Sequence, residues 1–182
     1  MVNISKLTLT NLQQTIVRHL CINAGISLNA RTIARFLNVS QPAVSKALPH
    51  LRQENLIKVI KDTDSKRLSI ELNRDSRQVI WLKRADNIQL IYESGLVQHL
   101  YDTFPGGTVI LFGSYAFGED TLHSDIDLAI IGIKPKDINL ESFEHFLRRP
   151  ITINYYKSFQ NIDKHLLNNI LNGITLKGAV EL

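Results

Sequence analysis

Residues 108–133 constrain the possible fold more than any other part of the sequence. Two apolar runs, 109–112 and 128–133, are bounded by glycine or polar residues, and short runs of this kind are typical of buried β-strands. The first run ends abruptly in Gly113 and Ser114, two small residues that favour a turn. We therefore predict two buried strands, the first of which leads directly into a Gly-Ser turn.

Two carboxylates open the second predicted strand. Asp125 and Asp127 are separated by Ile126, so on a strand the two carboxylates lie side by side while Ile126 turns into the core. Adjacent carboxylates repel each other and are costly to desolvate, so they do not serve stability. A divalent cation resolves the conflict, because Mg²⁺ takes oxygen ligands and fills its other positions with water and phosphate oxygens. We predict that Asp125 and Asp127 hold metal and act in catalysis.

The predicted Gly-Ser turn supplies donors that complement the carboxylates. Gly113 lets the backbone approach a ligand closely, backbone N–H groups there can cradle a phosphate, and Ser114 adds a hydroxyl. Metal and phosphate together indicate phosphoryl or nucleotidyl transfer, with Mg²⁺ or Mn²⁺ as the metal and a nucleoside triphosphate as substrate or ligand. The alternative interpretation is a hairpin-like loop with an incidental surface Asp-x-Asp.

The whole pattern resembles the signature of the nucleotidyltransferase superfamily, which contains DNA polymerase beta, kanamycin nucleotidyltransferase and the minimal nucleotidyltransferases. In that superfamily an apolar strand, Gly-Ser, about ten residues and Asp-x-Asp follow in order. Here ten residues separate Ser114 from Asp125. The resemblance implies a small mixed β-sheet with helices. It also implies nucleotide binding by Gly113 and Ser114 and Mg²⁺ binding by Asp125 and Asp127.

Active members of this superfamily usually carry a third acidic residue on the next strand of the sheet. The strand expected here, 151–156, contains no Asp or Glu, and the polar residue facing the site would be Thr152 or Asn154. An amide cannot act as a general base and ligates Mg²⁺ more weakly than a carboxylate. Glu144 and Asp163, on the flanking predicted helices, are other acidic residues that could approach the site. The departure bears on catalysis and not on the fold.

The first half of the chain predicts three helices and a hairpin. A capping box beginning at Thr10 opens the first helix, Asn29 begins the second, and Ser40 caps the third. Two strand patterns follow, 56–60 and 67–72, and the polar residues between them predict a turn with a basic tip. Three helices followed by such a hairpin form a winged helix-turn-helix.

Residues 32–48 closely resemble those of many prokaryotic winged-helix transcription regulators. The resemblance implies that the third helix enters the major groove and that the hairpin touches the backbone or the minor groove. Residues 1–84 hold fourteen Lys and Arg against five Asp and Glu, a net charge of +9, and residues 85–182 hold seven against twelve, a net charge of −5. A basic half suits a polyanion, so we predict double-stranded DNA as a partner. The alternative is a winged helix used for protein contacts.

Polar residues of the third helix and the hairpin are the candidates for DNA contact, because they can reach base edges or phosphates. These candidates are Ser40, Gln41, Ser45, Lys46, Lys66 and Arg67.

The predicted architecture is a two-domain α+β fold. A winged helix-turn-helix covers 1–73, a connecting helix covers 74–94, and a nucleotidyltransferase-like domain with the polymerase beta type of fold covers 95–182. Apolar residues fall on more than one face of the connecting helix, which predicts more than one contact. The helix either joins the domains or pairs with its copy in a homodimer, and Trp81 within it is interpreted as a core or interface residue.

Other sequence features bear on the cellular location of the protein and on further candidate residues. No apolar run approaches the length of a membrane span, so we expect no membrane partner and a cytoplasmic location. Cys21 is the single cysteine, which excludes an internal disulfide. His123, two residues before Asp125, either contacts phosphate or is an exposed loop residue. The pair Arg148 and Arg149 either meets a triphosphate or caps its helix.

Two hypotheses for function follow. The first is a DNA-binding nucleotidyltransferase that transfers a nucleoside monophosphate, with AMP as a candidate, from a metal–nucleotide complex to an unknown acceptor. Minimal nucleotidyltransferases include antitoxins that modify a partner toxin, which makes a partner protein a candidate acceptor. The second is a transcription regulator whose nucleotidyltransferase-like domain is inactive and serves nucleotide sensing or dimerisation. The absent third acid favours the second, and the intact Gly-Ser and Asp-x-Asp favour the first.

Overall fold

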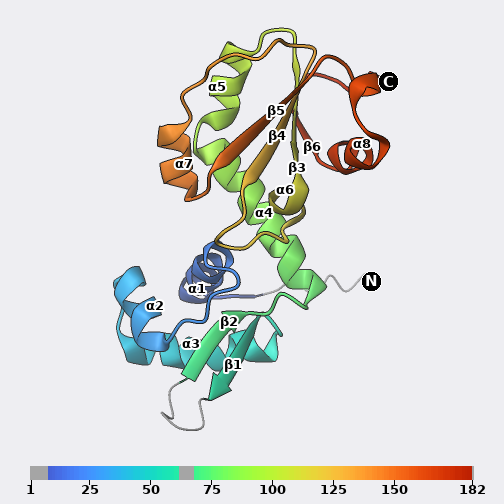
Figure 1. The fold of residues 1–182 in the computed structure, drawn as a ribbon. Coiled ribbons are helices and arrows are strands. Elements are labelled where there is room, and N and C mark those ends of the chain that lie inside the picture. Colours follow the sequence, from blue (N-terminus) through green and yellow to red (C-terminus); the bar gives the residue numbers. More distant parts are fainter. Residues whose placement is uncertain (1–7, 62–67, 182) are drawn as a thin grey trace, which may run out of the picture. The chain divides into compact units, whose positions relative to one another are not determined.

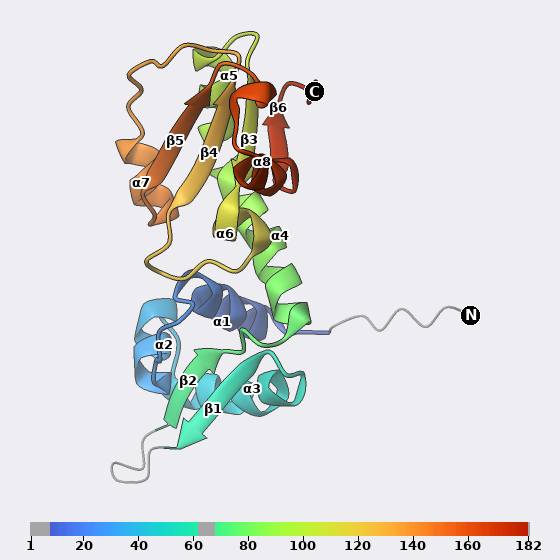
Figure 2. The same ribbon diagram turned by 45° about the vertical axis from the view of Figure 1, so that its right-hand side comes forward.

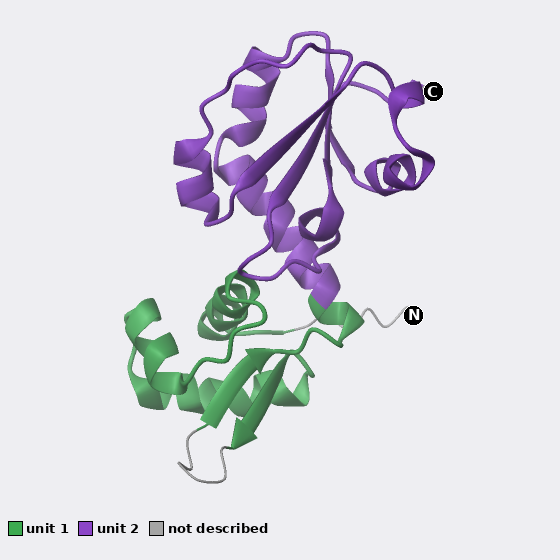
Figure 3. Ribbon diagram, in the orientation of Figure 1, with its two compact units in different colours: residues 1–79 green, residues 80–182 purple. Residues whose placement is uncertain are grey.

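The computed structural model describes residues 8–61 and 68–181 of the chain. The chain divides into two compact units, residues 1–79 and 80–182 (Figure 3). The division falls inside helix α4 (Arg77–Glu93), which begins in the first unit and continues in the second. The predicted two-domain α+β fold is confirmed.

Helices in the first unit begin where the sequence places their N-caps. The side chains of Thr10, Asn29 and Ser40 each accept a hydrogen bond from a backbone N–H of the first turn. Thr10 and Gln13 form the predicted capping box. Asn38 adopts the left-handed conformation, with φ at 53°, that makes the tight turn before the third helix. The helices are α1 (Asn11–Ile22), α2 (Ala30–Leu37) and α3 (Gln41–Gln53).

A hairpin completes the predicted winged helix-turn-helix (Figure 1). Strands β1 (Ile57–Lys61) and β2 (Leu68–Leu72) pair antiparallel. Ile70 is fully buried, but Leu68, which the alternation places on the same face, is 42% exposed. Leu68 lies at the last step of the ladder and lines an open pocket instead of the core. The predicted basic tip, with Lys66 and Arg67, lies outside the described residues.

The second unit is built on a sheet with the strand order β5-β4-β3-β6. Strand β3 runs antiparallel to both β4 and β6, while β4 and β5 are parallel, so the sheet is mixed as predicted (Figures 1 and 2). The strands are β3 (Thr108–Phe112), β4 (Ile126–Ile131), β5 (Ile151–Tyr156) and β6 (Ile174–Lys177).

Helices cover both faces of this sheet. Alternate residues of β3 and β4 pack on one face with α4, α5 (Leu96–Thr103) and α7 (Glu141–Leu147). The residues between them pack on the opposite face with α8 (Lys164–Leu171). Figure 1 shows α5 and α7 on one side of the strands and α8 on the other. Because both faces are buried, the strands read as continuous apolar runs in the sequence.

One local prediction is wrong in detail. Gly113 and Ser114 do not form a turn, because they are the first residues of a short helix, α6 (Gly113–Phe117), that follows β3 directly. At the start of α7 the N-cap is Leu140, and the Asn139 side chain accepts a hydrogen bond from the Glu141 N–H at 3.0 Å. Gly95 takes a left-handed conformation between α4 and α5 and separates the two helices.

Trp81 is not a core residue, since 66% of its surface is exposed on α4. Its interpretation as an interface residue stays a prediction. Among the described residues, no helix has the length and apolar character needed to cross a lipid bilayer.

Candidate functional site

Gly113 occupies a position that strongly favours glycine. It lies at the junction of β3 and α6 and has φ at 73°, in the left-handed region that favours glycine. A Cβ atom on this residue would come within 2.6 Å of the Asp127 Oδ2 atom. The absence of a side chain therefore allows the Asp127 carboxylate to lie directly against the backbone at the start of α6.

Asp125 and Asp127 stand at the start of β4, as predicted. Asp127 pairs with Phe112, the last residue of β3, so the carboxylate and the start of α6 meet at one end of the sheet. Ile126 is fully buried on the opposite face, which confirms that the two carboxylates share a side. Asp125 is exposed and Asp127 is half-buried. We call these two residues the carboxylate pair.

Thr152 takes the place where related folds are expected to carry a third acid. In the parallel ladder of β4 and β5, Thr152 lies beside Asp127. The Thr152 hydroxyl donates a hydrogen bond of 3.4 Å to Asp125 Oδ2. Asn154 lies two residues further along, beside Ala129. Thr152 is therefore the polar neighbour of the carboxylate pair, and it can orient a carboxylate but cannot accept a proton as a third carboxylate would.

The carboxylate pair is electrostatically unbalanced. Burial, and then the charge of Asp125, raise the pKa of the Asp127 carboxyl above its ordinary value. Burial, and then the charge of Asp127, likewise raise the pKa of the Tyr156 hydroxyl on β5. Both shifts have the sign expected where burial and a neighbouring negative charge disfavour ionisation. A bound cation would oppose both.

Glu144 and Asp163 are engaged elsewhere. The Glu144 carboxylate accepts a hydrogen bond of 2.8 Å from the Ile151 N–H, and Asp163 caps α8 by accepting from the His165 N–H at 2.9 Å. Among the described residues, no group of three or more His, Cys, Asp or Glu side chains is placed to hold a metal ion. The side-chain oxygens that the structure brings together here are those of the carboxylate pair and Thr152, and Ser114 lies at the start of the adjacent α6.

A second group of charged residues lies buried beside the same segment, and the sequence reasoning missed it. The Lys83 ammonium contacts Asp120 Oδ1 at 2.6 Å, and the Asn87 amide donates to the same oxygen at 2.7 Å. The Arg149 guanidinium lies 3.4 Å from Asp120 Oδ2. Only 2% of Lys83 and none of Asp120 is exposed. We call Lys83, Asn87, Asp120 and Arg149 the Asp120 cluster.

The Asp120 cluster ties α4 to the segment between Ser114 and Asp125. Asn87 also donates to the Tyr115 carbonyl at 2.9 Å, within α6. Gly118, just after α6, packs so closely on α4 that a Cβ there would lie 2.5 Å from the Ile80 carbonyl. The segment that joins the phosphate-binding candidates to the carboxylate pair is thus held against α4 at three points.

One sequence signal could have identified this cluster. The buried residues of α4 recur every fourth position, and two of the four are polar: Val79, Lys83, Asn87 and Ile91. A lysine on the buried face of a helix requires a partner, because burial of an unpaired charge is costly. Arg149 belongs to this cluster, because its guanidinium lies beside Asp120. Arg148 ends α7 in a left-handed conformation. His123 is exposed.

The candidate DNA-contacting residues of α3 lie on its outer face. Gln41, Ser45 and Lys46 are exposed, and so is Ser40, whose hydroxyl caps the helix by accepting from the Ala43 N–H at 3.3 Å. The opposite face is buried through Val44, Ala47, Leu48 and Leu51. Amphipathic packing of this kind fixes which side chains of α3 can reach a ligand.

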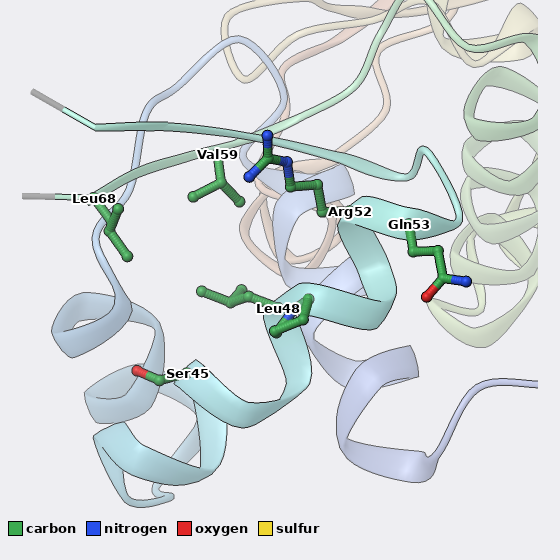
Figure 4. A pocket seen from close by; sticks show the side chains of 7 residues that line it. Ser45, Leu48, Arg52, Gln53, Val59 and Leu68 are labelled. Atoms are coloured by element: carbon green, nitrogen blue, oxygen red, sulfur yellow. The ribbon is translucent and has the colours of Figure 1, made fainter.

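Two pockets flank α3 in the first unit. One, of about 450 Å³, is polar and is lined in part by Arg31, Arg35 and Gln41. The other, of about 550 Å³, lies between α3 and the hairpin, where Val59 and Leu68 point toward Leu48 (Figure 4). Arg31 and Arg35 stand one turn apart on α2, so the polar pocket places two guanidinium groups beside the start of α3.

Comparison with known families matches both units. Residues 94–172 match the nucleotidyltransferase domain family, and residues 9–69 match the MarR family. The first match decides against an incidental Asp-x-Asp in a loop. The comparison with curated proteins yields no match.

Solved structures of bacterial regulators resemble part of the chain. The adhesin competence repressor AdcR of Streptococcus pyogenes is 26% identical over 53% of this chain and 69% of that chain, with a TM-score of 0.41. MepR, a transcription regulator of the Staphylococcus aureus multidrug efflux pump MepA, is 26% identical over 54% and 67%, with a TM-score of 0.39. A MepR–DNA complex is 22% identical over 52% and 77%, also at 0.39. Structural likeness at this level supports no functional conclusion.

Proposed function

We propose that this chain, in which a MarR-type DNA-binding winged-helix domain is joined to a nucleotidyltransferase domain, transfers a nucleoside monophosphate from a metal–nucleotide complex to an acceptor. The observation that carries the proposal is the carboxylate pair, of which Asp127 lies against the Gly113 backbone. A nucleotidyltransferase domain implies a nucleotide substrate and a divalent metal, and we propose Mg²⁺, or Mn²⁺ in its place, with ATP as the first nucleotide to test.

The residues at the site fit such a metal. The carboxylates of Asp125 and Asp127 are hard oxygen donors. Burial first, and then the charge of Asp125, raise the pKa of Asp127, and a cation would offset both effects. Asp125 and Asp127 would hold the ion, which when bound neutralises phosphate charge and orients the triphosphate. Gly113 and Ser114 would hold the triphosphate itself, because the first N–H groups of a helix have no partner within it.

The reaction joins the acceptor hydroxyl oxygen to the α-phosphorus. The bond from that phosphorus to its bridging oxygen breaks, pyrophosphate leaves, and the hydroxyl loses its proton to solvent water. Thr152 orients Asp125 but cannot take this proton, since a hydroxyl is a very weak base near neutral pH. We therefore expect slow turnover.

The test is incubation with Mg²⁺ and α-labelled nucleoside triphosphates, with the chain and a hydroxyl-bearing protein as acceptors. We expect labelled product that Asp125→Asn reduces by about 100-fold or more. Asp137→Asn, which changes an exposed carboxylate outside the site, is the matched control. Nucleotide binding without labelled product would defeat transfer.

A second candidate function is a regulator whose nucleotidyltransferase domain binds nucleotide without catalysis. The presence of Thr152 beside Asp127, in place of an acid, favours this candidate. The same incubation distinguishes the two, because calorimetry would then give a metal-dependent affinity for ATP while no product forms.

The first unit would bind double-stranded DNA through the exposed face of α3. Gln41, Ser45 and Lys46 can reach base edges or phosphates, and Arg31 and Arg35 can neutralise phosphates. The affinity should fall steeply with salt, and Lys46→Ala should weaken binding and flatten the salt dependence. Lys134→Ala, which removes an exposed lysine of the second unit, is the matched control. An interaction that salt does not weaken would contradict this proposal.

We also propose that the protein acts as a homodimer. Trp81 and Tyr92 are exposed on α4, and Trp81 is the chain's single tryptophan. Its fluorescence should shift to shorter wavelength as protein concentration rises, since pairing would bury it. Light scattering that gives a monomer mass at all concentrations would contradict the dimer.

A further inference from the structure

Helix α4 is the one described element that belongs to both units. Its first residues, Arg77 to Val79, fall in the first unit, and the remainder falls in the second. The helix contains no proline or glycine, the usual causes of kinks. It is therefore one continuous helical stretch of backbone that carries residues of both units.

The start of α4 is anchored to the end of α3. The Asn73 amide donates to the Asn55 carbonyl at 2.9 Å and to the Asn55 side chain at 2.8 Å. Asn55 follows directly on the last turn of α3, and the Asn73 carbonyl accepts from the Ser76 N–H at 3.1 Å. Val79, the last residue of the first unit, is 1% exposed. Hydrogen bonds through Asn73 thus link the residue that follows α3 to the turn that leads into α4.

The second part of α4 is anchored to the nucleotide site. Lys83 and Asn87 hold Asp120, and Asn87 holds the carbonyl of Tyr115, the residue after Ser114. Arg149, two residues before β5 and three before Thr152, reaches the same Asp120 carboxylate. The Asp120 cluster therefore joins α4 to α6, to the segment before Asp125 and to the start of β5.

We propose that α4 couples nucleotide binding to DNA binding, with Lys83 and Asn87 as the positioning residues that transmit the change. This inference rests on nucleotide binding at the proposed site but not on catalysis there. A nucleotide that shifts α6 or the carboxylate pair must either move α4 or break the buried contacts of the Asp120 cluster. Since coupling free energies are reciprocal, DNA must change nucleotide affinity by the same factor.

The test is a thermodynamic cycle on the full chain. DNA affinity is measured by fluorescence anisotropy with and without saturating Mg-ATP, and Mg-ATP affinity is measured by calorimetry with and without DNA. We expect the two ratios to agree and to lie within about 5- to 150-fold. Asp125→Asn should abolish the shift in DNA affinity, which separates site-specific binding from the added charge of ATP.

Asn87→Leu tests the route, because leucine has a similar size and cannot donate to Asp120 or Tyr115. We expect the coupling ratio to fall toward one. Gln89→Leu makes the same change on the exposed side of α4 and should leave the ratio unaltered. Equal coupling in both variants would overturn the route.

The outcomes separate this inference from the proposed function. If Mg-ATP does not bind at all, the nucleotide site itself is wrong. If Mg-ATP binds and DNA affinity is unchanged in the wild-type protein, the site stands and the coupling is overturned. The wild-type cycle decides this even if Asn87→Leu fails to fold.

Discussion

Asp120 and the carboxylate pair lie within eight residues of chain, and they differ in burial and in the charges around them. Asp120 is fully buried, yet Lys83, Asn87 and Arg149 surround its two oxygens. The carboxylate pair is more accessible, yet burial and mutual repulsion raise the pKa of Asp127. Among the described residues, cationic side chains thus contact Asp120, the carboxylate that is hardest to solvate, and no ion pair is seen at Asp125 or Asp127.

The difference in charge balance indicates that the Asp120 cluster is structural and that the carboxylate pair is a candidate binding site. A buried charge whose partners come from the same chain is complete without a ligand, and removing one partner leaves the others uncompensated. A pair of like charges without a counter-charge is incomplete, and its free energy falls when a cation arrives. Electrostatic balance, more than burial or acidity, therefore distinguishes the Asp120 cluster from the candidate site.

The largest effect on stability should come from removing the carboxylate of the Asp120 cluster. Asp120→Ala leaves Lys83 and Arg149 buried without their carboxylate, and we expect a loss of about 3–5 kcal/mol in the free energy of unfolding of the second unit. Denaturant titration measures it. Asp137→Ala, on an exposed carboxylate, should change stability by less than about 0.5 kcal/mol. Equal effects of the two changes would erase the distinction.

A smaller effect is expected at Gly113. Alanine must adopt φ near 73° and place its Cβ against Asp127, so Gly113→Ala should cost about 1–2 kcal/mol and abolish metal-dependent nucleotide binding. Gly106→Ala separates the two causes, because Gly106 has φ at 77° but nothing within 4 Å of an added Cβ. That control should lose a similar stability and retain nucleotide binding, as measured by thermal unfolding and calorimetry.

Thr152→Asp would add a third negative charge to the carboxylate pair. A third carboxylate beside Asp127 should lower stability without metal by about 1 kcal/mol and raise metal affinity by about 10-fold. Thr175→Asp, at the opposite edge of the sheet, is the matched control. Calorimetric titration with Mn²⁺ measures the affinity, and unchanged affinity would remove Thr152 from the site.

The smallest effect concerns Asp127 and has the opposite sign. Because its folded-state pKa is raised, its charge weakens the fold at pH values above its ordinary value of 3.8, and the penalty fades as pH falls and the carboxyl gains a proton. Asp127→Asn should therefore stabilise the apoprotein by about 0.5 kcal/mol at pH 7 and not at pH 3.5. Unfolding at the two pH values checks this, and destabilisation at pH 7 would contradict the imbalance.

Local features of the fold could be predicted because short-range chemistry determines them. The caps at Thr10, Asn29 and Ser40 and the break at Gly95 depend on neighbouring residues alone. Helix α6 could not be predicted, because five residues are too few to show helical periodicity. The exposure of Trp81 depends on which face of α4 meets the sheet, which apolar spacing on several faces leaves open.

The carboxylate pair of the candidate site could also be predicted from neighbouring residues, but its surroundings could not. The juxtaposition of Asp125 and Asp127 follows from strand alternation. The place of Thr152 beside Asp127 follows from the parallel register of β4 and β5, which requires a pairing across 25 residues of chain. The Asp120 cluster joins residues from positions 83 to 149, and such contacts leave only an indirect mark in the sequence, a lysine at an apolar position of α4.

The continuity of α4 sets a helical phase between Val79 and Lys83. Each residue of an α-helix turns the chain by about 100°, so one residue inserted between Val79 and Lys83 would turn the whole Asp120-facing side away from the side that Val79 defines. Seven inserted residues, close to two full turns, would nearly restore it. A linker of loose coil would tolerate either change. The number of residues in this helix, as well as their identity, is therefore part of what the chain encodes.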